Sequence, residues 1–132
     1  MKRLVLESYL FLLRCEFVVT TLGLRSLHRD VLEAKVEASR SAQLVSAEDI
    51  SHAMDLACVF YPKRVFCLQR SAATALLLRR HGIRAELILG ARILPFKSHA
   101  WVEVEGLVVN DRPYMREVYQ ILETCSGPEV SG

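Results

Sequence analysis

Apolar residues recur with the period of an α-helix in the first part of the chain and in short strand-like runs after residue 82. The clearest helix follows Ser46, a predicted cap, with Asp49 placed as in a capping box. Its apolar positions lie three and four residues apart: Ile50, Ala53, Met54, Ala57, Cys58 and Tyr61. His52 and Asp55 fall on the opposite, polar face, so we expect no catalytic role for either.

An apolar run from Leu4 to Leu24 opens the chain. Glu7, Arg14 and Glu16 interrupt it, so no uncharged stretch approaches the ~20 residues of a membrane span. No signal-peptide cleavage site follows. The run predicts a helix whose apolar face consists of Leu6, Leu10, Leu13, Phe17, Val18 and Val19. This face either packs in the core, docks a partner protein or lies on a membrane surface.

Residues 25–45 are rich in charged and small residues and predict a mostly exposed helix or linker. The apolar stripe there is thin, consisting of Leu32, Val36 and Ala38. A second strong helical pattern begins at Cys67 and ends near Gly82, which suits a left-handed cap. Basic residues in its last turn suit the negative end of the helix dipole, and small residues at 72, 73 and 75 allow a close approach to a sheet.

Strand-like runs follow at residues 83–90, 99–104 and 107–111, and residues 118–122 predict a last strand or a covering segment. Residues 91–97, with Pro95, predict a loop or an edge. Gly106 suits the left-handed third position of a three-residue loop, 104–106. That register places His99 opposite Asp111, whereas a two-residue loop would turn Asp111 to the other face.

Three residues in this region form a candidate catalytic set. Cys67 at a helix start meets unpaired N–H groups and the positive dipole end, which favour a thiolate. His99 on a strand and Asp111 beside it complete the pattern of a nucleophile, its base and the group that orients the base. Each residue alone is ordinary, but their combination and order indicate a cysteine enzyme. The Cys67 N–H, with Gln69 as a weaker second candidate, would stabilise an oxyanion.

Composition narrows the possibilities further. At 132 residues we expect one domain spanning 1–132, with a helical part at 1–60 and a catalytic core at 61–115. The net charge of +2 comes from scattered basic residues, which argues against nucleic-acid binding. The cysteines (Cys15, Cys58, Cys67, Cys125) and histidines show no metal-ligand spacing, so we expect no metal, no cofactor and free thiols in the cytoplasm.

Four segments resemble the lasso-peptide leader peptidases of the microcin-processing type, cysteine proteases of the transglutaminase-like superfamily. The segments are residues 66–71, 79–83, 95–104 and 109–111. The resemblance implies an α+β, papain/transglutaminase-like fold, with N-terminal helices and a catalytic-cysteine helix packed on a small antiparallel sheet. It also implies that Cys67, His99 and Asp111 cut the leader from a ribosomally made precursor peptide. The implied partners are that precursor, a separate small winged-helix leader-binding protein and an ATP-using macrolactam synthetase.

Two alternatives to a peptidase remain open at the level of sequence. The same three residues serve acyl transfer to an amine, as in a transglutaminase or amidase, since they do not reveal whether water or an amine resolves the thioester. A non-catalytic adaptor of the same fold is the other alternative. A Cys67 thiol no more reactive than that of Cys58 would favour the adaptor.

Overall fold

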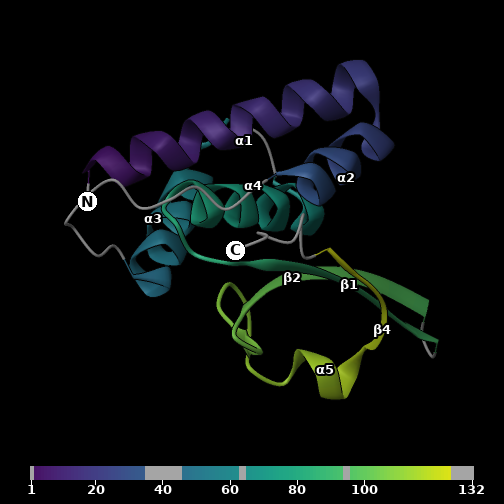
Figure 1. Ribbon diagram of the computed structural model, residues 1–132. Coiled ribbons are helices and arrows are strands. Elements are labelled where there is room, and N and C mark those ends of the chain that lie inside the picture. Colours follow the sequence, from purple (N-terminus) through teal and green to yellow (C-terminus); the bar gives the residue numbers. More distant parts are fainter. Residues whose placement is uncertain (1, 35–45, 63–64, 94–95, 126–132) are drawn as a thin grey trace.

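The helices of the N-terminal half lie on one face of an antiparallel sheet in the computed structural model, which describes residues 2–34, 46–62, 65–93 and 96–125 (Figure 1). The elements are, in order, α1 (Lys2–Leu22), α2 (Leu24–Glu33), α3 (Ala47–Phe60), α4 (Cys67–Arg80), β1 (Glu86–Ile93), β2 (Phe96–Val104), β3 (Leu107–Val108), α5 (Met115–Val118) and β4 (Gln120–Cys125). The short α5 lies on the other side of the sheet (Figure 1). This arrangement is the α+β fold expected from the sequence.

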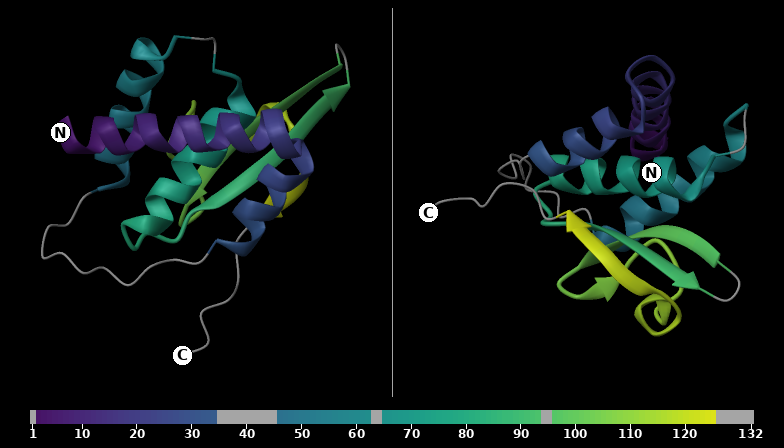
Figure 2. Two further views of the ribbon diagram at one scale, coloured as in Figure 1. Left: turned by 90° about the horizontal axis from the view of Figure 1, so that it is seen from above. Right: turned by 90° about the vertical axis from the view of Figure 1, so that its right-hand side faces the viewer.

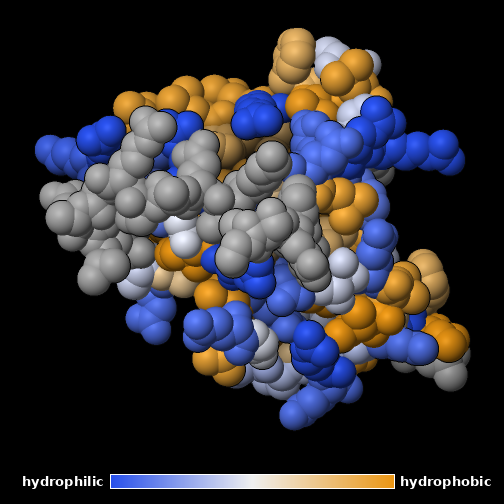
Figure 3. Space-filling model, viewed as in Figure 1, coloured by the Kyte–Doolittle hydropathy of each residue, from blue (hydrophilic) through white to orange (hydrophobic). Residues whose placement is uncertain are grey.

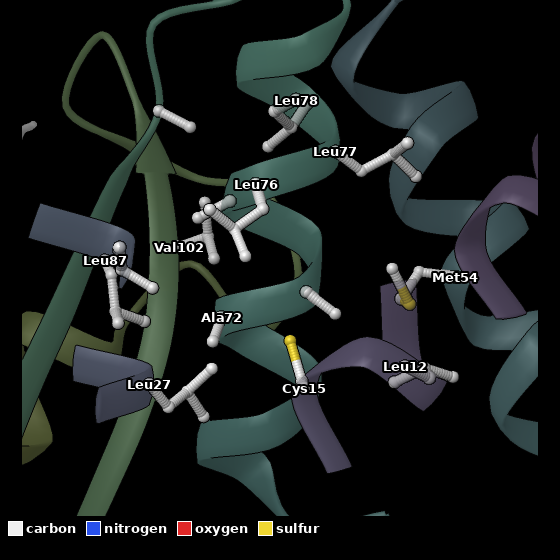
Figure 4. Packing of buried hydrophobic residues seen from close by; sticks show 14 of the residues in the cluster. Leu12, Cys15, Leu27, Met54, Ala72, Leu76, Leu77, Leu78, Leu87 and Val102 are labelled. Atoms are coloured by element: carbon white, nitrogen blue, oxygen red, sulfur yellow. The ribbon is translucent and has the colours of Figure 1, made fainter. Parts of the chain in front are cut away.

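Helix α4 lies between the sheet and the other helices. Leu76 packs toward Val102 of β2, whereas Leu12 and Met54 pack on its opposite side (Figure 4). Ala72, Ala73 and Ala75 are fully buried, which confirms that small residues let this helix approach the sheet closely. Gly82 follows the helix with a φ of +82°, as its predicted left-handed cap requires.

The sheet has the strand order β3-β2-β1-β4 with antiparallel neighbours throughout. Its β2–β3 register differs from the prediction, because Val104 pairs with Leu107 across a two-residue turn. Both turn residues have positive φ, +53° at Glu105 and +79° at Gly106, as in the hairpin turn whose twist matches that of the strands. Gly106 is therefore left-handed as expected, but the three-residue loop was wrong.

The first hairpin is longer than the sequence suggested. Strand β1 continues to Ile93 and pairs there with Phe96, the first residue of β2. Residues 91–93 and 96–97 are therefore strand rather than loop, while Pro95 lies outside the described residues. Strand β4 pairs with β1 with a register irregularity between Leu89 and Gly90. This pairing selects the strand interpretation for the segment after residue 118.

Helix α1 forms as predicted, but of the predicted face only Val18 is buried, with Val19 packed against the core. Its buried residues are Ser8, Leu12, Cys15 and Val18. Leu6 and Phe17 of the predicted face are 60% and 66% exposed, and Leu10 and Leu13 also lie exposed. Figure 3 shows hydrophobic side chains along this edge of the molecule. In the part of the chain that the structure describes, every helix is too short or too polar for a membrane span.

The choice of the buried face follows from contacts that α1 makes with other elements. Gln69 Nε2 of α4 donates a hydrogen bond to the Leu12 carbonyl over 3.1 Å. The Tyr61 hydroxyl donates to Glu16 on the same side of α1. Most sides of this helix carry apolar residues, so hydropathy alone did not identify the side that these polar contacts select.

Helix α2 replaces part of the exposed segment expected at residues 25–45. Leu27 and Val31 are buried, whereas Leu32, assigned to the predicted stripe, is exposed. Val36 and Ala38 lie outside the described residues. The Ser46 side chain accepts a hydrogen bond from Asp49 N–H at 3.1 Å, which confirms the predicted cap of α3.

Candidate active site

Cys67 is the first residue of α4 and is exposed. Phe66 before it has extended backbone, and no side chain caps the helix start. The first N–H groups of an α-helix have no partner within the helix, so the Cys67 thiol lies beside donors that favour negative charge. The sequence prediction for the position of this residue is thus confirmed.

The other three cysteines are in different surroundings. Burial raises the pKa of the Cys15 thiol to about 12 and that of the Cys125 thiol to about 11. Burial also raises the pKa of Cys58. All four thiols are free, and Cys67 is the exposed one. Thiolate reactivity therefore favours Cys67 over the other three.

His99 and Asp111 form a hydrogen-bonded pair. His99 Nε2 lies 2.6 Å from Asp111 Oδ2, and the two side chains are 19% and 28% exposed. The imidazole packs against two rings, with its centroid 6.1 Å from that of Trp101 and 5.2 Å from that of Tyr119. A second Asp111 oxygen accepts the Arg112 N–H at 2.7 Å. The carboxylate is thus fixed by its own turn while it orients the ring.

Asn110 explains how Asp111 reaches His99 despite the two-residue turn. The ladder continues as far as Val109, whose N–H donates to the Val102 carbonyl over 3.0 Å. The Val102 N–H instead donates to the Asn110 side-chain oxygen at 2.8 Å. Strand β3 ends before this point, so the alternation of an ideal strand no longer decides where Asp111 points. The predicted pairing is observed, although the register behind it was wrong.

The same asparagine ties the strand to the cysteine helix. Asn110 Nδ2 donates to Ser71 Oγ at 2.9 Å, and Ser71 Oγ donates to the Ala100 carbonyl at 3.0 Å. Both side chains are buried. Ser71 lies one turn after Cys67, about 6 Å along the helix axis. The start of α4 is therefore held beside the residue that follows His99.

Arg70 adds a weaker connection at the same place. Its Nη2 contacts the Asn110 carbonyl at 3.4 Å and forms an ion pair with Asp55 of α3. Asp55 is exposed, as expected, and its role is to pair with this arginine. The first turn of α4 is thus joined to both α3 and the segment that carries Asp111.

The structure brings His99 and Asp111 together, and it places Cys67 at the start of the helix that is bonded to β2 through Ser71 and Ala100. Among the described residues, no hydrogen bond joins the Cys67 sulfur to the imidazole. Gln69 points elsewhere, since its side chain donates to Leu12 of α1. The weaker candidate for an oxyanion donor is therefore engaged in helix packing.

Gly90 makes room for the aromatic residues around His99. It pairs with His99 across the β1–β2 ladder. A Cβ atom at this position would lie 2.8 Å from the Trp101 ring and 3.0 Å from Tyr119 Cβ. Both rings contact the imidazole and each other, so the absence of a side chain at residue 90 allows the aromatic packing that supports His99.

Glu103 anchors the aromatic side of the sheet. Burial would raise the pKa of this carboxyl, but hydrogen bonds from Arg116 and Trp101 outweigh that effect and hold the pKa below its usual value. Arg116 donates to both carboxylate oxygens, at 2.7 and 2.8 Å, and Trp101 Nε1 donates at 2.9 Å. Trp101, which contacts His99, is thereby fixed by a charged pair.

Comparison with known proteins identifies the family. The model of the transglutaminase-like superfamily matches residues 9–124. The chain belongs to the transglutaminase-like superfamily. Cys67, His99 and Asp111 all lie inside the part that matches this superfamily.

One curated protein is similar to part of this chain. The microcin J25-processing protein McjB of Escherichia coli is 45% identical over 56 residues. The aligned stretch is 42% of this chain and 27% of McjB, so it spans little more than a quarter of the relative. No solved structure matches the chain.

Sequence reasoning missed two groups of residues. The roles of Ser71 and Asn110 depend on a contact between segments 39 residues apart, although Asn110 was visible as the neighbour of Asp111. His28 of α2 lies against Glu123 and Cys125 of β4, and the three candidate ligand atoms all lie within 4.8 Å of one another. Metal-ligand motifs that can be seen in a sequence consist of residues close together, whereas His28 is 95 positions from Glu123.

Proposed function

We propose that this chain is a cysteine endopeptidase that removes the leader from the precursor of a lasso peptide. The observation that carries the proposal is the exposed Cys67 thiol at the start of α4, next to a strand whose His99 is already paired with Asp111. Superfamily membership supports a cysteine hydrolase. The similarity to a microcin-processing protein supports a peptide precursor as the substrate.

In the proposed mechanism, the Cys67 thiolate attacks the carbonyl carbon of the scissile bond. Asp111 contacts His99 Nε2, so Nδ1 is the ring nitrogen available to exchange a proton with the thiol. The C–N bond then breaks and the imidazolium gives its proton to the leaving amine. Water, deprotonated by the same imidazole, hydrolyses the thioester and releases the acid and the thiol.

The helix start supplies the electrostatic part of this mechanism. The backbone N–H of Cys67 is one of the unpaired donors at the beginning of α4, and it would hold the oxyanion of the tetrahedral intermediate. Catalytic hydrogen bonds commonly tighten only when substrate is bound. The hydrogen bonds of Ser71 with Asn110 and Ala100 would keep the start of α4 close to His99. Only a small movement would then bring Cys67 and His99 into contact.

The proposed partners are the leader of the precursor, a separate small winged-helix leader-binding protein and the ATP-using synthetase that closes the freed peptide. We assign the leader-binding protein to the exposed stripe of α1, consisting of Leu6, Leu10, Leu13 and Phe17. Exposed apolar patches of this kind are typical of protein interfaces.

Thiol labelling tests the activated cysteine. We expect a small alkylating agent near pH 6 to modify Cys67 first, because burial raises the pKa of Cys15, Cys58 and Cys125. Mass mapping of the four cysteines gives the result. Selective labelling that His99→Ala suppresses supports a thiol–imidazole pair. Labelling of Cys67 no faster than that of Cys58, with or without the partner, would favour the adaptor.

A cleavage assay with a precursor peptide and the leader-binding partner tests the reaction itself. We expect Cys67→Ala to abolish cleavage while its unfolding transition stays close to that of the parent, since this side chain is exposed. Full cleavage by Cys67→Ala would refute the mechanism. A product joined to an added amine, in place of a free acid, would identify an acyl transferase instead.

The docking surface has its own test. Leu10→Glu or Leu13→Glu should lose stimulation by the partner, while the rate of Cys67 alkylation stays unchanged. Leu107→Glu is the matched control, because Leu107 is an exposed leucine on β3. Equal stimulation of all three variants would exclude the α1 stripe as the contact surface.

A further inference from the structure

A second cluster of reactive side chains lies between α2 and β4, apart from the cysteine helix start. His28 Nε2 is 2.9 Å from Glu123 Oε2 and 3.5 Å from Cys125 Sγ. The three ligand atoms all lie within 4.8 Å of one another. Glu123 and Cys125 are two residues apart on β4, so they project to the same side of the strand, where α2 passes (Figure 2).

The protons of these side chains cannot give all three atoms a good hydrogen bond at once. One imidazole nitrogen carries at most one proton, which it can direct well at either the carboxylate or the sulfur. If Nε2 instead accepts the Cys125 S–H, it faces the Glu123 oxygen at 2.9 Å with no proton between them. A cation among the three atoms would satisfy all of them at once, because nitrogen, oxygen and sulfur each offer a lone pair.

We propose that His28, Glu123 and Cys125 form a site for a divalent zinc-type ion. Zinc binds imidazole nitrogen and carboxylate oxygen at ~2.0–2.2 Å and thiolate sulfur at ~2.3 Å, commonly in a tetrahedron. Neighbouring ligands of such a tetrahedron lie roughly 3–4 Å apart. The 3.5 Å contact of His28 with Cys125 is in this range, and the 2.9 Å contact with Glu123 is just below it. The mixed set with sulfur favours zinc or cobalt over magnesium or calcium.

The surroundings hold the buried ligand of this cluster in place. Cys125 is fully buried, and its carbonyl accepts a hydrogen bond from Arg79 Nη2 at 2.9 Å, which fixes the end of β4. A carboxylate and a thiolate balance the two charges of the ion. Arg79 is near the end of α4, whereas Cys67 is at its start about 20 Å away by helix length. The ion would clamp α2 to β4 without taking part in the reaction of Cys67.

Cobalt spectroscopy of the intact chain tests the proposal. We expect added Co²⁺ to give tetrahedral d–d absorption together with a sulfur-to-cobalt charge-transfer band, and added Zn²⁺ to displace it. Glu123→Gln should weaken Zn²⁺ binding by at least about tenfold, and His28→Gln and Cys125→Ser should remove the charge-transfer band. Zn²⁺ should also raise the melting temperature of the parent but not of His28→Gln.

Matched variants keep the test sharp. His52→Gln and Cys58→Ser, both on α3, and Cys67→Ala should retain the spectrum of the parent. Glu123 is exposed, so Glu123→Gln remains informative if Cys125→Ser does not fold. Absence of the bands in the parent, their persistence in His28→Gln, or their loss in Cys67→Ala would overturn the proposal.

Discussion

The two ends of α4 use the same helix for opposite purposes. At its start, Cys67 is exposed and its neighbours hold it through the Ser71–Asn110 hydrogen bonds. Near its end, Arg79 is fully buried and donates to four backbone carbonyls. These belong to Val31, Ala34, Ala85 and Cys125. The start of the helix is accessible to a substrate, whereas its end is bonded to α2 and to the sheet.

The buried end illustrates how a charge can be accommodated without being used. Burial lowers the pKa of Arg79, because a guanidinium without water is less stable in its charged form. The backbone carbonyls offset that cost by accepting its N–H groups, and the negative end of the helix dipole is close by. A change at this end should therefore affect stability, and a change at the other end should affect turnover.

Asp111→Ala should give the largest effect at the open end. We expect turnover of a precursor peptide to fall by ~10²–10⁴, because the imidazole loses the group that orients it. The melting temperature should change little, since the pair with His99 is partly exposed. Steady-state cleavage and thermal unfolding measure the two quantities. An unfolded Asp111→Ala protein would mean that this residue contributes to stability, as Arg79 does, rather than to turnover alone.

Arg79→Met should give the largest loss of stability at the buried end of α4. It leaves several buried carbonyls without donors, so we expect the free energy of unfolding to fall by roughly 3–5 kcal/mol. Arg80→Met is the matched control, because the neighbouring arginine is exposed and should change stability by less than about 0.5 kcal/mol. Denaturant titration of both variants gives the values. Similar losses in the two variants would contradict the assigned role of Arg79.

Ser71→Ala tests the connection between helix and strand. Removal of the hydroxyl takes away the acceptor of Asn110 Nδ2 and the donor to the Ala100 carbonyl, which should cost about 1–3 kcal/mol. Turnover should fall as well, because the cysteine helix loses its register against His99. Thr74→Val is a suitable control, since its hydroxyl bonds only within α4, to the Arg70 carbonyl. Equal turnover in these two variants would count against a positioning role for Ser71.

Glu105→Asn should give the smallest effect and a gain. Glu105 has a φ of +53°, a left-handed conformation that costs an ordinary residue roughly 1–2 kcal/mol. Asparagine followed by glycine suits this turn, so we expect stability to rise by ~0.5–1 kcal/mol at unchanged turnover. Glu105→Gln should give no gain. A gain of equal size in both variants would point to charge rather than backbone conformation.

Local sequence patterns were sufficient for α3, for α4 and for the ends of these helices. The cap at Ser46, the helix from Cys67 and the left-handed Gly82 each follow from a few neighbouring residues. The His99–Asp111 pair was expected, but through a register that the structure does not have. The pair forms because the Asn110 side-chain oxygen, rather than a backbone carbonyl, accepts the Val102 N–H. The alternation of side chains along an ideal strand does not predict this hydrogen bond.

Contacts between distant segments could not be predicted from local sequence patterns. The buried face of α1 depends on Gln69, and the burial of Arg79 depends on carbonyls from residues 31 to 125. A last-turn arginine normally suits the helix dipole from the surface, so its position alone gave no sign of this network. Physical reasoning from local pattern predicts such a residue's secondary structure but not its partners.

The place of β4 at the end of the described chain affects how the protein forms during synthesis. Strand β1 pairs with β2 on one side and with β4 on the other. Until residues 120–125 leave the ribosome, β1 is an unpaired edge, and Arg79 lacks the Cys125 carbonyl. A nascent chain therefore carries its exposed cysteine before its sheet is complete, and that interval is when chaperones would have the most to protect.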